Sequence, residues 1–170
     1  MTADGYELPI LFLKPGEMVI REEPMIVTTL LGSCVAVTMF SRRLQMGAIC
    51  HAVLPTCRKD LPCSHSQTEA GKYVECAVRL MLEEFLARGV AKNDIEAKLF
   101  GGSDMFDTAA RAKSQSQSVG KQNMAMALEV LQRQSVRVAI QDLGGPRGRK
   151  IIFHTHTGEV FLKRLRQSEI

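Results

Sequence analysis

The sequence predicts an α+β fold in which two helices cover one face of a mixed, largely antiparallel sheet system. Three observations support this prediction. Short apolar segments rich in β-branched residues outnumber helical segments, turn-length stretches that favour hairpins separate most of them, and only two stretches carry apolar residues at helical spacing. The 170 residues contain no visible repeat or linker, so we expect residues 1–170 to form a single domain.

Strands dominate the first third of the chain. A turn at Pro15-Gly16 lies in or beside the first of them, and Gly32-Ser33 interrupts a long uncharged run whose Thr and Ser residues are typical of strands rather than of a membrane span. We expect the last two segments of this region to pair as an antiparallel hairpin. The strands predicted here cover residues 10–20, 25–31, 34–40 and 46–54.

Two helices are predicted in the remainder, at residues 72–88 and 121–134. The first has an apolar stripe at spacings of three and four, made of Tyr73, Cys76, Ala77, Leu80, Met81 and Phe85. The second should direct Met124, Ala127, Leu128 and Leu131 inward. A polar loop is expected at 56–71, and further strands at 96–100, 136–141, 151–155 and 160–165.

Composition narrows the class of protein. Hydrophobic residues make up 45% and charged residues 24%, as in soluble globular proteins. No basic segment precedes the short apolar stretch 8–13, so we predict a cytoplasmic protein without membrane insertion. The net charge of +4 is a mild excess of basic residues. A nucleic-acid-binding domain is a rival function, but the 5% aromatic content without Trp argues against it, and a salt-dependent DNA shift assay would test it. Five cysteines, an odd number, predict free thiols.

One cysteine and one histidine stand out as candidates for chemistry. Cys34 begins a predicted strand directly after Gly32-Ser33, and His51 lies on the next strand, 17 residues later. Side chains on adjacent strands can meet, and a protonated imidazole beside a thiol favours the thiolate and can protonate a leaving group. Backbone N–H groups at the Gly-Ser turn could hold an oxyanion. A small buried cysteine and a structural histidine would give the same spacing, so these two residues alone leave both interpretations open.

Five motifs carry a family resemblance. In order they are 27–37 (VTTLLGSCVAV), 47–55 (GAICHAVLP), 98–106 (KLFGGSDMF), 119–123 (VGKQN) and 142–149 (DLGGPRGR). Together they resemble the CheD family of chemoreceptor glutamine deamidases over roughly residues 10 to 165. The resemblance implies a layered α/β/β fold shared with bacterial toxin deamidases.

The resemblance also implies a set of site residues. Cys34 would be the nucleophile, His51 the general base, and Thr28 the residue that orients the imidazole. Substrate-binding positions would be Gly32, Ser33, Gly101, Gly102 and Ser103. No metal or organic cofactor is expected.

The implied function is hydrolytic deamidation of glutamine side chains in the cytoplasmic helices of chemotaxis receptors, through a thioester that releases ammonia. Receptor methyl esters would be a second substrate, and a CheC-type phosphatase a possible regulatory partner. Basic residues such as Arg147, Arg149 and Lys150 could contact acidic surfaces of these proteins. The alternative is a regulatory binding module that engages the phosphatase without turnover.

Two other groups of residues could bind metal. Cys57, Cys63 and His65, with Cys50 or Cys76 nearby, do not have the spacing of a common zinc motif, so loop thiols are the preferred interpretation and metal analysis would test it. His154 and His156 are two residues apart and could share one strand face, but no third ligand is apparent. The Gly101-Gly102 and Gly144-Gly145 pairs are interpreted as tight turns rather than phosphate-binding loops, because neither has the required strand-glycine-helix pattern.

Overall fold

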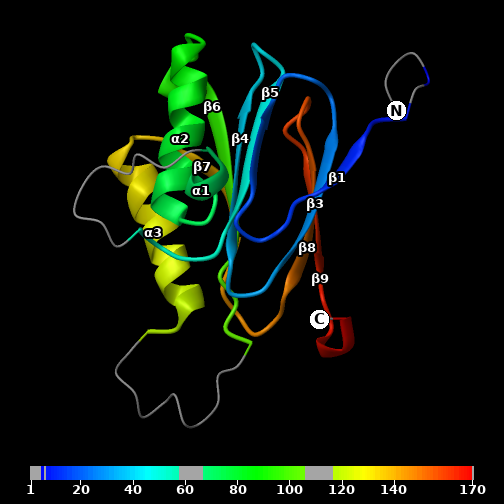
Figure 1. Ribbon diagram of the computed structural model, residues 1–170, viewed down its shortest axis with the longest axis vertical. Helices are drawn as coiled ribbons and strands as arrows, with labels where there is room; N and C mark the ends of the chain where they lie inside the picture. The colour runs from blue at the N-terminus through cyan, green and yellow to red at the C-terminus, as the bar shows by residue number, and fades with distance from the viewer. Residues whose placement is uncertain (1–4, 6, 58–66, 106–116, 170) are drawn as a thin grey trace.

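Two stacked sheets and a layer of helices make up the protein (Figure 1). The computed structural model describes residues 5, 7–57, 67–105 and 117–169. Helices α2 and α3 lie on the outer face of one sheet, and the other sheet packs against its inner face (Figure 1). The predicted α+β class and its layered α/β/β arrangement are confirmed.

The sheet that carries no helices has four strands in the order β1-β3-β8-β9. Strand β1 runs parallel to β3, and the other neighbours are antiparallel. Its strands are β1 (Ile10–Phe12), β3 (Ile26–Leu31), β8 (Arg149–His154) and β9 (Val160–Arg164).

The sheet beneath the helices has five strands in the order β2-β5-β4-β6-β7. Only the β6–β7 pair is parallel, and the predicted hairpin is the antiparallel pair β4–β5. Its strands are β2 (Met18–Arg21), β4 (Val35–Ser41), β5 (Met46–Ala52), β6 (Ile95–Gly101) and β7 (Val138–Leu143).

The segment 10–20 differs from the prediction of one strand. It contains β1 and β2, which belong to different sheets, and the chain crosses between the sheets at the Pro15-Gly16 turn. Hydrophobic pattern alone does not distinguish one interrupted strand from two strands in stacked sheets, because both alternate in the same way.

Two long helices match the predictions in position, α2 at Val74–Ala87 and α3 at Val119–Arg133. Ser118 is the N-cap residue of α3, and its Oγ accepts a hydrogen bond from the Lys121 N–H at 3.3 Å. Short helical turns add α1 (Gln67–Ala70), which lies in the predicted loop 56–71, and the 3₁₀ helices η1 (Lys92–Asp94) and η3 (Gln167–Glu169). Residues 58–66 of that loop are outside the described ones.

The buried face of α3 is rotated from the predicted one. Leu128 is 39% exposed, and the polar Asn123 is fully buried instead. The buried stripe follows the helical spacing of Gly120, Asn123, Ala127, Val130 and Leu131. The prediction missed Asn123 because it counted only apolar side chains as inward-facing.

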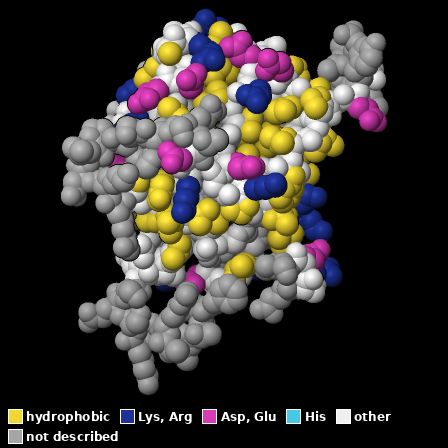
Figure 2. All heavy atoms as spheres, viewed as in Figure 1, with side chains coloured by type: hydrophobic (Ala, Val, Ile, Leu, Met, Phe, Trp, Pro, Cys, Tyr) yellow, Lys and Arg dark blue, Asp and Glu magenta, His cyan; other side chains and the backbone are white. Residues whose placement is uncertain are grey.

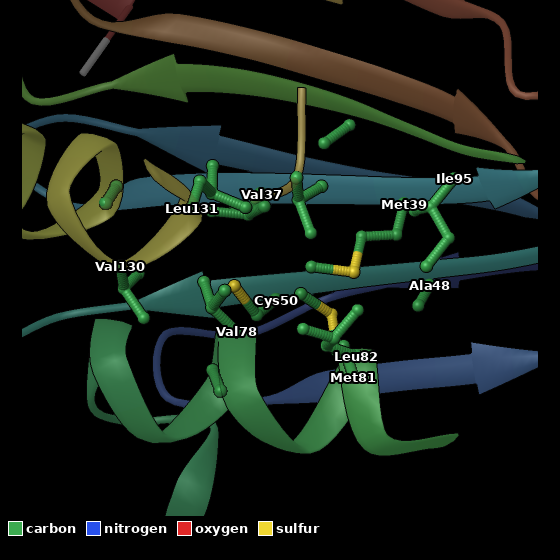
Figure 3. Packing of buried hydrophobic residues seen from close by; sticks show 14 of the residues in the cluster. Val37, Met39, Ala48, Cys50, Val78, Met81, Leu82, Ile95, Val130 and Leu131 are labelled. Carbon is green, nitrogen blue, oxygen red and sulfur yellow. The ribbon is translucent and has the colours of Figure 1, made fainter. Parts of the chain in front are cut away.

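Side chains of the central strands alternate between two cores. One face of β4 and β5 packs under the helices, where Val37 and Cys50 meet Val78 and Met81 of α2 (Figure 3). The other face packs against the four-stranded sheet, where Ala36, Ile49 and Phe100 meet Val27, Leu31, Ile151 and Phe153. The position of a residue along β4 or β5 therefore decides which core its side chain enters.

The surface carries both signs of charge. On the face drawn in Figure 2, Lys and Arg side chains lie among Asp and Glu side chains and do not gather in one patch. Among the described helices, none has the length and apolarity that a membrane crossing requires.

Candidate active site

Cys34 and His51 point into the same core, between the two sheets. His51 on β5 lies directly opposite Ala36 on β4, and Cys34 precedes Ala36 by two residues. Residues two apart on a strand share a face, and Cys34 packs against the same apolar cluster as Ala36. The two side chains are therefore diagonal cross-strand neighbours, whose Cβ atoms typically lie about 7 Å apart.

His51 is tied to the other sheet through a threonine hydroxyl. The Thr29 Oγ1 lies 2.7 Å from His51 Nδ1 and 2.7 Å from the carbonyl oxygen of Leu13. A carbonyl can only accept, so the single hydroxyl proton of Thr29 goes to Leu13, and Thr29 must accept from His51. In the neutral imidazole Nδ1 then carries the proton and Nε2 keeps the lone pair.

The threonine beside Nδ1 of His51 is Thr29, whereas the family resemblance implies Thr28 for the residue that orients the imidazole. Successive side chains of β3 face opposite sides, and Thr29 enters the inter-sheet core while Thr28 does not. The hydroxyl of Thr28 is buried and has no hydrogen-bond partner within the described part of the chain. Matching motif positions did not detect which of two adjacent threonines faces the histidine.

Burial controls the protonation of both groups. Burial lowers the pKa of His51 to about 4, against smaller opposing effects of the Leu13 carbonyl and the Glu17 carboxylate. Burial also raises the pKa of the Cys34 thiol, opposed in part by its own backbone N–H. Both shifts favour the uncharged forms, so the resting site does not favour the thiolate–imidazolium pair expected from the sequence.

The turn that presents Cys34 is held from one side by backbone hydrogen bonds. The carbonyl of Gly32 accepts from the Ser103 N–H at 2.9 Å, and the carbonyl of Cys34 accepts from the Gly102 N–H at 2.9 Å. Gly101 has φ +107°, and a Cβ there would lie 2.2 Å from the Cys34 carbonyl oxygen. Only glycine allows β6 to approach the turn this closely.

Two backbone donors at this turn are available. The N–H groups of Ser33 and Cys34 donate to no other residue in the ranges that the structure describes. Both belong to the turn that presents the Cys34 side chain, which makes them candidate donors for a developing oxyanion.

A small pocket of about 120 Å³ opens beside the turn. Ser33 and Ser103, two of the predicted substrate-binding residues, line it together with Asp104, Met105, Ser118, Val119 and Gly120. Gly32, Gly101 and Gly102 are not among its lining residues, although a Cβ at Gly32 would lie 2.9 Å from Cε of Met105, which lines it.

A buried arginine organises the loop after β7. Arg149 is 3% exposed, donates to Asp142 Oδ1 at 2.7 Å and to the Gly144 carbonyl at 2.8 Å, and contacts Ser103 Oγ at 2.7 Å. Arg149 is thus a buried structural residue of the site. The sequence-based expectation that it is a surface cation able to contact acidic partners does not hold.

The other candidate constellations lie elsewhere. Cys50 precedes His51 on β5, so its side chain faces the opposite side of the sheet. It is buried under the helices, and this burial raises the pKa of its thiol to about 11. Cys76 is disulfide-bonded, contrary to the expectation of free thiols. Cys57, whose Sγ lies 3.6 Å from that of Cys76, is a free thiol, and so are Cys34 and Cys50. Cys63 and His65 lie outside the described residues. The rings of His154 and His156 are 6.0 Å apart, and no group of three metal-ligating side chains occurs among the described residues.

Comparison with known proteins identifies the family. The family model described as CheD chemotactic sensory transduction matches residues 54–164. "Probable chemoreceptor glutamine deamidase CheD 2" of Geobacter sulfurreducens is 44% identical over 99% of this chain and 98% of its own. "Probable chemoreceptor glutamine deamidase CheD" of Maridesulfovibrio salexigens is 38% identical over 97% of both chains, and the protein of that name from Oleidesulfovibrio alaskensis is 38% identical over 93% of this chain and 74% of its own. The chain belongs to the CheD family.

Proposed function

We propose that this protein hydrolyses the carboxamide of glutamine side chains in chemoreceptors to glutamate and ammonia, with Cys34 as nucleophile and His51 as base. The observation that carries the proposal is that the thiol of Cys34 and the imidazole of His51 face the same core from adjacent segments, with Nδ1 of the imidazole hydrogen-bonded to Thr29. The names of the relatives, chemoreceptor glutamine deamidases, support the substrate class.

The first step joins thiol and amide. As Sγ of Cys34 attacks the carboxamide carbon, Nε2 of His51 takes the thiol proton, so a resting thiolate is not required. The C=O π electrons move to oxygen, and the N–H groups of Ser33 and Cys34 stabilise the oxyanion. Losing one such donor typically costs about 3 kcal/mol of transition-state stabilisation.

The second half returns the enzyme to its starting state. The imidazolium of His51 gives its proton to the amide nitrogen, the C–N bond breaks, and ammonia leaves a thioester on Cys34. Water then gives a proton to His51 as its oxygen attacks the thioester carbon. The C–S bond breaks, glutamate leaves, and the imidazolium of His51 returns its proton to Sγ of Cys34. A glutamyl methyl ester would form the same thioester with methanol as the leaving group. None of these steps draws on a metal or an organic cofactor.

Thr29 acts as a positioning residue in this scheme. Its hydroxyl accepts from Nδ1 and thereby keeps the reactive lone pair on Nε2. The backbone also fixes His51, because its N–H donates to the Glu17 carbonyl at 2.9 Å and its carbonyl accepts from Gly16 at 2.8 Å.

The setting of the reaction follows from the proposed substrate. The receptor helices are cytoplasmic, so the enzyme acts in the cytoplasm, and a CheC-type phosphatase is its regulatory partner. Each turnover converts a neutral side chain on a receptor helix into a carboxylate, which changes the repulsion between helices.

The test is incubation with receptor cytoplasmic fragments, with ammonia release and the amide-to-acid mass change as readouts. Cys34→Ala should abolish both, and Cys50→Ala, which alters a thiol in the other core, should retain them. Unchanged turnover by Cys34→Ala would exclude the nucleophile assignment. An inert wild-type protein that still binds a CheC-type phosphatase would instead identify a regulatory binding module.

A further inference from the structure

Asn123 connects the two chain segments that carry Cys34 and His51. Its side chain is completely buried, on the face of α3 that packs against β4. One amide hydrogen of Nδ2 goes to the Ser33 carbonyl at 3.0 Å and the other to the Val53 carbonyl at 2.9 Å. Ser33 directly precedes the cysteine, and Val53 follows the histidine by two residues.

The contact lies where the β4–β5 ladder ends. The last paired residues are Val35 and Ala52, and the next pair in register would be Cys34 and Val53. Beyond that point no strand pairing maintains the separation of the two segments. The carboxamide of Asn123 bridges the gap, since it binds one carbonyl on each side.

The same contact orients a backbone donor. The Ser33 carbonyl and the Cys34 N–H belong to one planar peptide unit and point in opposite directions. Holding that carbonyl toward α3 aims the Cys34 N–H away from α3, and this N–H is one of the two donors left free at the turn. Rotation of the peptide would turn the donor away from the oxyanion.

A purely structural role explains Asn123 poorly. Its Oδ1 is buried and has no hydrogen-bond partner among the described residues. An unpaired buried acceptor is destabilising, and this offsets much of what the two Nδ2 bonds contribute. A close approach of α3 is needed to bring Asn123 here, and Gly120 permits it, because a Cβ at that position would lie 2.6 Å from the Ser103 carbonyl oxygen.

We propose that Asn123 is a positioning residue of the active site, which aims the Cys34 N–H at the oxyanion and maintains the spacing between the Cys34 turn and the His51 strand. This inference rests on the proposed function. It concerns stabilisation of the tetrahedral intermediate and not generation of the nucleophile. Loss of Asn123 should therefore impair addition to a carbonyl much more than it impairs other reactions of the thiol.

The experiment compares Asn123→Leu and Asn123→Asp with Gln122→Leu and Gln122→Glu. Gln122 is the exposed neighbour on the same helical turn, so its variants reproduce the loss of an amide and the added charge. For both Asn123 variants we expect kcat for receptor deamidation to fall at least tenfold with KM changed less than threefold, while alkylation of Cys34 by iodoacetamide, which forms no oxyanion, changes less than threefold. The Gln122 variants should match the wild type. Circular dichroism establishes that each variant is folded, and Asn123→Leu remains informative if the buried carboxylate of Asn123→Asp unfolds the protein.

A second readout needs no turnover. Addition of the Cys34 thiol to butyraldehyde gives a hemithioacetal whose oxygen occupies the oxyanion position, and ¹³C NMR of the aldehyde carbon measures its formation. Folded Asn123→Leu should bind the aldehyde at least tenfold more weakly than the wild type. If kcat and aldehyde affinity stay within twofold of the wild type, or if alkylation falls in parallel with them, the inference is overturned. A wild-type protein that binds the aldehyde but does not deamidate receptors would contradict the proposed function. In that case the aldehyde affinity of Asn123→Leu relative to the wild type still decides whether Asn123 positions the oxyanion donor.

Discussion

The buried imidazole of His51 should make the free energy of unfolding depend on pH between about 6.5 and 4. The pKa of this group is about 4 in the folded protein against an ordinary value of 6.5, and the side chain is only 2% exposed. Because the folded pKa is the lower one, the stabilising contribution is complete above pH 6.5 and is lost as the pH falls toward 4, where the unfolded chain binds a proton that the folded chain does not. Each pKa unit corresponds to about 1.4 kcal/mol, so the total loss is about 3 kcal/mol, of which about 2 kcal/mol should be lost by pH 5.

Urea denaturation of the wild type and of His51→Gln at pH 7.5, 6 and 5 measures this contribution. Carboxylates that titrate in the same range are common to both proteins and cancel in the difference. We expect the wild type to lose about 2 kcal/mol more than the variant between pH 7.5 and pH 5. Parallel stability curves for the two proteins would refute the conclusion that His51 is held uncharged, and with it the neutral thiol–imidazole starting state of the proposed mechanism.

Three further predictions follow from the site. Thr29→Val should lower kcat and destabilise the protein by about 2 kcal/mol, because it leaves the Leu13 carbonyl and Nδ1 of His51 without this partner. Thr28→Val should be neutral or stabilising, because the Thr28 hydroxyl has no partner among the described residues. If urea denaturation shows Thr28→Val to be the less stable variant, the assignment of Thr29 is contradicted. Gly101→Ala should cost about 3 kcal/mol or more, since its Cβ meets the Cys34 carbonyl at positive φ, and a thermal melt indistinguishable from the wild type would be inconsistent with that contact. The rate of Cys34 alkylation should keep rising with pH above 8.5, because burial raises the thiol pKa, and a plateau reached below pH 7 would instead indicate a preformed thiolate.

Elements with a strong local pattern were predictable. The β4–β5 hairpin and helices α2 and α3 occur where alternation and helical spacing placed them, with ends shifted by a few residues. The placement of Cys34 and His51 on one face also follows from local order, because a hairpin fixes which residues of its two strands face each other.

The structure differs from the sequence-based expectations where a contact joins distant segments. Thr28 and Thr29 are adjacent in the chain and chemically identical, and only the packing of β3 against the other sheet decides which of them reaches His51. Asn123 was overlooked because a polar residue on a helix is usually exposed. The resting charge state also depends on tertiary structure, since proximity to a histidine favours a thiolate in water-like surroundings, whereas burial of both groups favours their uncharged forms.

The amino-acid sequence by itself determined the family and the class of fold and indicated two candidate residues for chemistry, because motifs, periodicity and residue type are properties of short segments. The stacking of two sheets decided the rest. It placed Thr29 beside His51 and excluded water from the imidazole, and the packing of α3 on the opposite face of the five-stranded sheet brought Asn123 to the end of the β4–β5 ladder. Burial and hydrogen-bond direction depend on atoms far apart in the chain, and they exist only once the tertiary structure has formed.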